Sequence, residues 1–249
     1  MAAGRVVVVS GGTRGIGRVI AERFQRDGST VAVCSRSPRD ASLPQPIWHG
    51  QVDVRDREAM RRFIQDVAQR FGPPAVLVNC AGVSRWRPVE ELDERLADEI
   101  IATSVLGTLW ACSATAPILA ARGCIINVSS LAGKRGGANN SAYCAAKFAV
   151  NGITQALAKE LGPRGIRVNA VCPVYVKTEQ LVEALSERSS PAQGQDVARY
   201  LDGFAATQTA LGRLPTADEV ADTVLFLASD AASGITGQCL NVDCGTLPQ

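Results

Sequence analysis

An apolar run at residues 5–9, with four consecutive valines, leads straight into a glycine-rich stretch at residues 10–17 and then into a helical pattern at residues 18–26. An uninterrupted β-branched run is typical of a strand that is buried on both faces. Glycines after such a strand permit a tight turn and let the backbone approach a pyrophosphate, which binds at the positive end of the following helix. The three pieces together predict a dinucleotide-binding unit.

Strands and helices alternate along the rest of the chain, which predicts βαβ units and therefore a parallel sheet. We expect an α/β protein with one Rossmann-type, doubly wound domain over residues 1–249, seven parallel strands, helices on both faces, and the ligand crevice at the carboxyl ends of the strands. The further strands are predicted at residues 30–34, 46–53, 75–79, 124–129, 166–172 and 238–242, and the main helices at residues 56–71, 96–121 and 142–161.

Two segments do not follow this alternation. Residues 37–46 carry three prolines and are too short for a crossover helix, so we expect an abbreviated helix or a plain loop there. Residues 177–215 mix helical patches at 181–187 and 197–204 with a Ser-Ser-Pro-Ala-Gln-Gly stretch. A long segment beside a ligand crevice suits a substrate lid, although a passive surface insertion is the alternative.

Tyr143 and Lys147 lie four residues apart in the predicted helix, so their side chains share one face. A free tyrosine titrates near pH ~10, and a neighbouring ammonium favours the phenolate and lowers that pKa. Proton exchange with a substrate oxygen then becomes practical near neutral pH. Ser130, thirteen residues before Tyr143, can supply a second hydrogen bond to the same oxygen. The pair taken alone can also arise by chance in a helix.

The residues after the second predicted strand bear on the choice between NAD and NADP. A carboxylate at this place binds the ribose 2′-hydroxyl and repels a 2′-phosphate, but the chain has no acid before Asp40. Arg36 offers a fork of donors to a phosphate, Ser35 adds a hydroxyl, and Arg14 in the glycine turn can approach from the other side. These residues favour NADP(H), with two solvated surface arginines as the alternative.

Motifs spread over nearly the whole chain resemble the short-chain dehydrogenase/reductase family. The matching stretches are residues 10–17, 53–54, 79–82, 127–130, 143–147, 167–173, 225–237 and 241–243. In that family a serine, a tyrosine and a lysine form the catalytic group. The resemblance therefore implies that Tyr143 donates a proton to a ketone, that Lys147 lowers the pKa of Tyr143 and binds the nicotinamide ribose, and that Ser130 polarises the carbonyl.

The resemblance also implies where the cofactor lies. It places Asp53 and Val54 against the adenine, Asn79 along the ribose, and Val176 and Thr178 against the nicotinamide carboxamide. For Asn79, capping of a strand end is an alternative role. The complete set of expected cofactor contacts is Gly11, Thr13, Arg14, Gly15, Ile16, Gly17, Ser35, Arg36, Asp53, Val54, Asn79, Ala81, Gly82, Tyr143, Lys147, Pro173, Val176 and Thr178.

Three residues depart from the family pattern. Ser104 stands where relatives carry an asparagine that supports the catalytic lysine, so we count Ser104 among the catalytic candidates and expect an altered proton relay. Val174 replaces a glycine after Pro173, which implies strain if that backbone needs a positive φ. Cys244 replaces a glycine near the C-terminus, with no consequence that we can derive from the sequence.

Within the family the chain most resembles 3-oxoacyl thioester reductases and polyketide-type ketoreductases, the latter through residues 132–136. Basic residues near the expected site mouth suit an acidic carrier protein or a phosphopantetheine arm; they are Arg85, Arg87, Lys134 and Arg135. A small free ketone, a sugar or a cyclic polyol remains an alternative substrate. A cofactor-binding regulatory or scaffold protein without turnover is the alternative of another class. The resemblance further implies a homotetramer, or a homodimer, paired through the helices at residues 104–121 and 141–161.

Composition excludes several other classes. A net charge of +2 gives no reason to expect a nucleic-acid or membrane partner, and no run of 18 apolar residues is present, so we expect a cytoplasmic protein. The single histidine, His49, cannot build a zinc site alone, and no metal is expected. The eight cysteines are irregularly spaced and are expected to behave as small buried hydrophobes.

Overall fold

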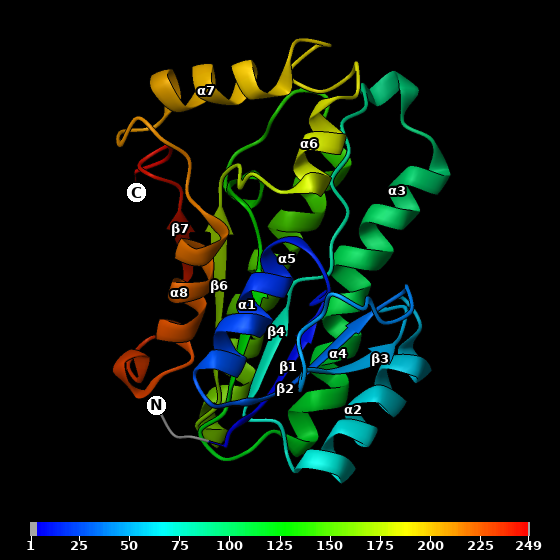
Figure 1. Cartoon of the computed structure of the whole chain (residues 1–249), viewed down its shortest axis with the longest axis vertical. Helices are drawn as coiled ribbons and strands as arrows, with labels where there is room; N and C mark the ends of the chain where they lie inside the picture. The colour runs from blue at the N-terminus through cyan, green and yellow to red at the C-terminus, as the bar shows by residue number, and fades with distance from the viewer. Residues whose placement is uncertain (1–3, 249) are drawn as a thin grey trace.

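Seven parallel strands form one sheet across residues 4–248, the part of the chain that the computed structural model describes (Figure 1). The order across the sheet is β3-β2-β1-β4-β5-β6-β7, so the direction of winding reverses between β1 and β4, and a crevice forms at the carboxyl ends of the strands there. The predicted doubly wound α/β fold is confirmed. The strands are β1 (Val6–Ser10), β2 (Thr30–Ser35), β3 (Trp48–Gln51), β4 (Val76–Asn79), β5 (Cys124–Val128), β6 (Arg167–Pro173) and β7 (Cys239–Val242).

Helices cover both faces of the sheet, which explains why the central strands are apolar without alternation. One face packs against α1 (Gly15–Arg26) and α8 (Ala217–Leu227), whose buried residues include Phe24 and Leu227. The other face packs against α2 (Arg57–Phe71), α4 (Gly107–Thr115) and α5 (Ser141–Leu161). Each face therefore has its own apolar layer.

The first helix begins three residues earlier than its sequence pattern indicates. Arg14 has an extended backbone (φ −151°) and is the N-cap, and α1 starts at Gly15 inside the glycine turn. Glycine has a low helix propensity, which hides this start in the sequence. As a result, the first turn of α1 is built from the glycine motif itself.

The segment between β2 and β3 forms a loop, as its three prolines predict. Leu43 and Ile47 from this loop are buried in the layer that contains α1, so they cover the sheet where a crossover helix is missing. The Arg39 guanidinium donates to the carbonyls of Ile47 (2.6 Å) and Leu43 (3.0 Å), which holds the loop against the sheet. The strand that follows, β3, is shorter than predicted.

The long helix predicted at residues 96–121 consists of several pieces. An α-helix, α3 (Glu94–Ile101), passes through a wide π-helical turn at Ala102–Leu106 into α4, and a 3₁₀ turn follows at Ala116–Ile118. Single π turns are rare and occur mostly at functional sites. The run Glu94–Ile118 is apolar enough by length and composition to cross a membrane, but it packs beside α2 and α5 as part of the domain.

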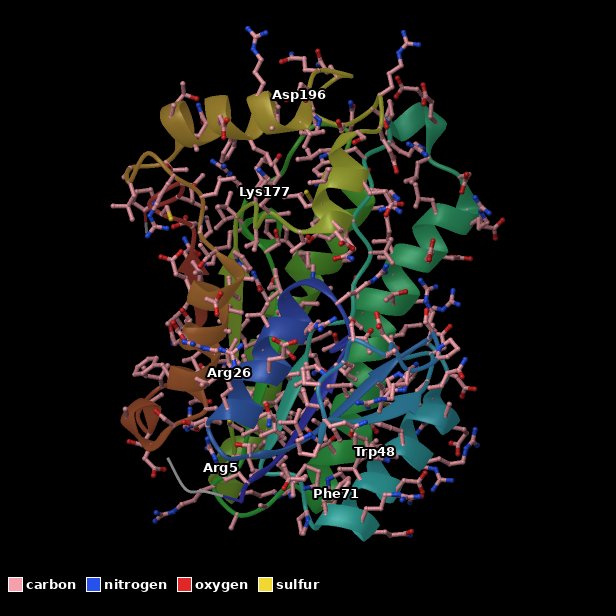
Figure 2. The ribbon with its side chains drawn as sticks, in the orientation of Figure 1. Arg5, Arg26, Trp48, Phe71, Lys177 and Asp196 are labelled. Atoms are coloured by element: carbon pink, nitrogen blue, oxygen red, sulfur yellow. The ribbon has the colours of Figure 1, made fainter. Side chains whose placement is uncertain are left out.

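Two helices stand over the carboxyl ends of the strands. They are α6 (Glu179–Leu185) and α7 (Val197–Gln208), at the top of Figure 1, and both overlap the helical patches predicted in residues 177–215. Figure 2 shows Lys177 and Asp196 at this end, with Arg5 and Phe71 at the opposite end of the molecule. A small apolar cluster fixes the two helices, with Trp86, Ala184, Leu185 and Leu201 at its centre.

Candidate active site

A cavity of about 1190 Å³ runs along the carboxyl edge of the sheet, beneath α6. Its size exceeds that of ordinary small-ligand pockets, so a dinucleotide and a further small molecule fit together. It brings together nearly all the residues expected to act or to bind. The expected residues that line it are Gly11, Thr13, Arg14, Gly15, Ile16, Gly17, Ser35, Arg36, Asp53, Val54, Ala81, Gly82, Ser130, Tyr143, Lys147, Pro173, Val176 and Thr178.

Tyr143 and Lys147 lie in the first two turns of α5, on the face that looks into the cavity. The Lys147 ammonium is 5.6 Å from the centroid of the Tyr143 ring and donates to the Val128 carbonyl at the end of β5 (2.8 Å). Lys147 is buried, with 5% of its surface exposed, whereas Tyr143 is half-buried. The helical spacing thus places a phenol and a buried positive charge side by side.

The ammonium of Lys147 has capacity left for a ligand. An ammonium carries three donors, and within residues 4–248 the Val128 carbonyl is the hydrogen-bond acceptor that it contacts. A buried charge with free donors is costly unless further acceptors reach it. Sugar hydroxyls supply such acceptors, so this part of the cavity fits the ribose of a nicotinamide nucleotide.

Two adjacent serines follow β5 and differ in their contacts. The Ser129 hydroxyl is buried and donates to the backbone carbonyl of Lys147 (3.3 Å), which ties it to α5. The Ser130 hydroxyl accepts from the backbone N–H of Ala132 (3.1 Å) and is only half-buried. Its own hydrogen is therefore available to a ligand oxygen, which supports the choice of Ser130 over Ser129.

Ser104 lies near Lys147 but is not among the residues that line the cavity. It is in the π turn, 1% exposed, and its hydroxyl has no hydrogen-bond partner in the described part of the chain. A methyl group placed on Gly82 would lie 3.6 Å from the Lys147 ammonium and 3.8 Å from the Ser104 hydroxyl. Gly82, which lines the cavity, is thus close to both side chains.

Asn79 is not a cavity residue, contrary to the expected ribose contact. Successive strand residues point to opposite faces, and Asn79 points to the side of α4. Its amide donates to Asn127 (2.9 Å) and to the Cys112 thiol (3.3 Å), and the Asn127 amide donates to Thr154 in α5 (2.8 Å). Asn79 therefore joins β4, β5 and the helices behind them, which favours its structural role.

The end of the cavity nearest β2, which is the expected adenosine end, holds two charge pairs that the sequence does not reveal. Arg36 contacts Glu99 of α3 (3.3 Å), and Asp53 binds the Arg55 guanidinium through both carboxylate oxygens (2.6–3.0 Å). The hydrogen bonds from Arg55 hold the pKa of the Asp53 carboxyl below its usual range. Arg14 is exposed at the same end.

The glycine turn forms a cradle for a phosphate. No side chain caps the start of α1, so the first N–H groups of the helix remain available to an anion. Gly15 has a φ of +54°, and a methyl group on it would meet the Gln180 amide oxygen of α6 at 2.7 Å. Gln180 therefore reaches across the cavity to the phosphate cradle, a contact that no motif in the sequence indicates.

Arg85 and Arg87 do not form the free basic patch expected at the site mouth. Arg85 pairs with Glu183 of α6 (3.0 Å) and with Glu187 (2.9 Å), and Arg87 pairs with Glu187 (3.0 Å) and the Ser189 hydroxyl (2.9 Å). The two arginines instead form a clasp between the loop after β4 and residues 183–189, at the end of α6 and just after it. Arg135 lies on the cavity rim.

Val174 and Cys244, the two remaining departures from the family pattern, differ in the sign of their backbone φ angle. Within residues 4–248 the non-glycine residues with positive φ are Arg122, Asn139, Gln193 and Cys244, so Val174 carries no such strain. Cys244 has a φ of 52°. A side chain in this left-handed conformation costs roughly 1–2 kcal/mol, which glycine avoids.

The wall of the cavity beyond Tyr143 is aromatic. Tyr175, two residues after Pro173, packs its ring 4.8 Å from that of Phe204, and its hydroxyl lies 3.4 Å from that of Tyr200. Burial raises the pKa of Tyr175 above its usual value, so it remains a neutral phenol. The sequence shows no periodic signal for this contact, because the three rings come from a loop and α7.

Metal ligands do not gather in the part of the chain that the structure describes: no three His, Cys, Asp or Glu side chains lie close enough to share an ion. All eight cysteines are free. Burial raises the pKa of Cys34 and Cys112 to about 12, so both remain protonated. Their environment agrees with packing rather than chemistry.

Comparison with known proteins gives full-length matches. A family model described as enoyl-(acyl carrier protein) reductase matches residues 11–246. A protein of Streptomyces virginiae, named as a ketoacyl reductase of monensin polyketide synthase, is 38% identical over 98% of this chain and 97% of its own length. Aldohexose dehydrogenase of Thermoplasma acidophilum superposes with a TM-score of 0.90 at 31% identity, covering 99% of this chain and 98% of that one. A short-chain dehydrogenase/reductase of Serratia marcescens superposes with a TM-score of 0.86 at 29% identity, covering 98% of each chain.

Proposed function

The chain belongs to the short-chain dehydrogenase/reductase family, whose members are oxidoreductases that use a nicotinamide dinucleotide on ketones and alcohols, and we propose that this member reduces a ketone to a secondary alcohol with NADPH. The observation that carries the proposal is the convergence of Ser130, Tyr143 and Lys147 on one end of a dinucleotide-sized cavity. The whole described chain serves as one NADP-binding domain, with residues 177–215 as its substrate lid.

The roles of the three side chains follow from their contacts. The nicotinamide, when bound, supplies the hydride. Ser130 donates its free hydrogen to the substrate carbonyl oxygen and holds it beside Tyr143. Tyr143 gives its phenolic proton to the same oxygen, and the adjacent charge of Lys147 stabilises the phenolate that remains. The reverse sequence oxidises the alcohol.

NADPH is preferred to NADH because of the residues around the adenosine end. Ser35, Arg36 and Arg14 line this end, and Asp53, its one expected carboxylate, is held by Arg55. A 2′-phosphate therefore meets guanidinium and hydroxyl donors. The pairing of Arg36 with Glu99 is the feature that opposes this preference, because a phosphate must compete with a carboxylate for the same guanidinium.

Two classes of substrate are candidates, and each agrees with the name of a similar protein. A ketoacyl substrate agrees with the Streptomyces virginiae protein, and a sugar agrees with the Thermoplasma acidophilum enzyme. The clasp weakens the case for a carrier protein, because Arg85 and Arg87 are already paired with Glu183 and Glu187 and are less available to an acidic partner. A small free ketone, sugar or cyclic polyol is therefore the better candidate. We propose a cytoplasmic homotetramer as the working form.

Replacement of Tyr143 tests the function. We expect Tyr143→Phe to lower kcat by at least about 100-fold, the usual contribution of a general acid, while the Kd for NADPH changes little. The measurement is NADPH oxidation followed at 340 nm with a panel of 3-oxoacyl thioesters, ketoses and small diketones. Tyr200→Phe is the matched control, because Tyr200 lies behind Tyr175, and it should retain turnover.

The non-catalytic alternative makes the opposite prediction. A regulatory or scaffold protein would bind NADPH tightly and oxidise it with no member of the panel. Turnover that survives in Tyr143→Phe would remove the proposed mechanism even if the protein is an enzyme.

A further inference from the structure

His49, the single histidine of the chain, lies next to the expected adenosine end of the cavity. In the parallel register His49 of β3 pairs with Val33 of β2, and Ser35 is two residues further along β2. Residues two apart in a strand share a face, so His49 and Ser35 are diagonal neighbours on the α1 side of the sheet. The Ser35 hydroxyl is 2.9 Å from the His49 Nε2, and Ser35 lines the cavity beside Arg36.

The hydrogen bonds of Ser35 fix the role of the imidazole. A hydroxyl has one hydrogen, and Ser35 donates it to the Ser37 carbonyl (3.0 Å). The tautomer that carries a hydrogen on His49 Nε2 satisfies both contacts at once, because the imidazole then donates to the Ser35 oxygen. Burial, and the nearby Arg39, lower the pKa of His49, so the imidazole is neutral at neutral pH and this assignment defines its tautomer.

A phosphate at this place needs a donor, and the tautomer decides whether Ser35 can be one. While His49 donates to the Ser35 oxygen, the Ser35 hydrogen can turn from the Ser37 carbonyl to a phosphate oxygen. An imidazole that accepted from Ser35 would compete with the phosphate for that hydrogen. Arg36 is already paired with Glu99. The hydrogen bond from Ser35 therefore contributes more to binding of the phosphate than it would beside an unpaired guanidinium.

We propose that His49 is a positioning residue for the 2′-phosphate of NADPH, which it serves by holding the Ser35 hydroxyl as a hydrogen-bond donor. This inference rests on the proposed use of NADPH. His49 does not contact the phosphate, and it acts only on the nucleotide that carries one. NADH, with a ribose hydroxyl at this place, gains little from a fixed donor.

Direct binding of the two cofactors tests the inference. We expect His49→Phe, which keeps a planar ring and removes the donor, to raise the Kd for NADPH about tenfold, as for the loss of one hydrogen bond to a charged group. The Kd for NADH should stay within about twofold on the same scale. His49→Gln, which keeps a side-chain N–H, should restore most of the NADPH affinity. Addition of His49→Phe to Ser35→Ala should have no further effect. Fluorescence titration of each purified full-length protein with each nucleotide gives these dissociation constants.

Several results would overturn the inference. Equal weakening of NADPH and NADH binding by His49→Phe would show a purely structural role, and unchanged NADPH binding would show no role. If His49→Phe does not fold, His49→Asn, which is too short to reach Ser35, carries the same expectations. A wild-type protein without preference for NADPH would overturn the cofactor proposal first, and this inference with it. A preference for NADPH that His49→Phe leaves at its wild-type size would overturn this inference alone.

Discussion

At the residue scale, Arg36 and Glu99 face each other across the adenosine end of the cavity at 3.3 Å, half-exposed on both sides. Charge-assisted hydrogen bonds contribute about 1.5–3 kcal/mol, which corresponds to a tenfold or larger change in affinity. We therefore expect Arg36→Ala to raise the KM for NADPH at least about tenfold and to leave NADH use nearly unchanged. Glu99→Gln should lower the KM for NADPH several-fold, because it frees the guanidinium.

Initial rates with each cofactor measure both effects. Glu94→Gln, in the first turn of the same helix, is the matched control for Glu99→Gln and should change neither KM. An equal loss of NADPH and NADH use in Arg36→Ala would contradict the assignment of Arg36 to the 2′-phosphate.

Residue identity alone predicts which stretches meet at the site, but not where each side chain points. The stretches containing Ser130, Tyr143 and Lys147 line one cavity, because parallel strands end at a common edge of the sheet and residues four apart in a helix share one face. Asn79 lies at the same edge, yet it points to the side of α4, and its motif gives no sign of the Asn127 partner. The partners Glu99 and Arg55 are also invisible in the sequence, because they depend on how α3 and a loop approach the cavity.

At the element scale, the residues just after α6, in the proposed lid, are attached to the loop after β4 by the ion pairs of Arg85 and Arg87 with Glu187. Partly exposed ion pairs each contribute about 0.2–1 kcal/mol. Loss of both through Glu187→Gln should therefore raise the open fraction of the proposed lid by about twofold to about thirtyfold. We expect faster limited proteolysis of residues 186–196 and a higher KM for the ketone, with kcat little changed.

Glu183→Gln is the matched control for the clasp, because Glu183 is 66% exposed and contacts Arg85 alone. It should change the proteolysis rate less than Glu187→Gln does. High salt should reduce the difference between wild type and Glu187→Gln, since screening weakens the exposed pairs. A rate of proteolysis that is the same in all three proteins would show that apolar packing alone holds α6.

The sequence predicts that a helix is present more accurately than it predicts where the helix begins and ends. The amphipathic run of α2 is predicted to within one residue of its observed bounds: the prediction begins at Asp56, which is the N-cap, and the helix ends before Gly72. The start of α1 is hidden by glycines, and no motif in the sequence indicates the π turn at Ala102–Leu106. Both features lie beside the site, where function competes with regular local structure.

At the scale of the whole molecule, one apolar surface has no covering layer within the part of the chain that the structure describes. Ile101 and Leu106 are 36% and 37% exposed at the π turn, and Phe148 is 49% exposed on α5, which packs beside it. Only 44% of the most apolar window of Glu94–Ile118 is buried within the chain. Apolar area of this kind on a folded domain marks an association surface, which supports the proposed pairing of subunits through these helices.

Charge placed on that surface should dissociate the assembly. We expect the double variant Leu106→Glu, Phe148→Glu to elute as a smaller species than wild type, because two buried carboxylates without partners are costly in a subunit interface. Light scattering coupled to size-exclusion chromatography gives the mass of each form. Val89→Glu is the control, since Val89 is 73% exposed on a short turn away from these helices, and it should keep the wild-type mass. A double variant with the wild-type mass and an unchanged circular dichroism spectrum would place the subunit contacts on another surface, and the apolar character of Glu94–Ile118 would then reflect packing within one chain alone.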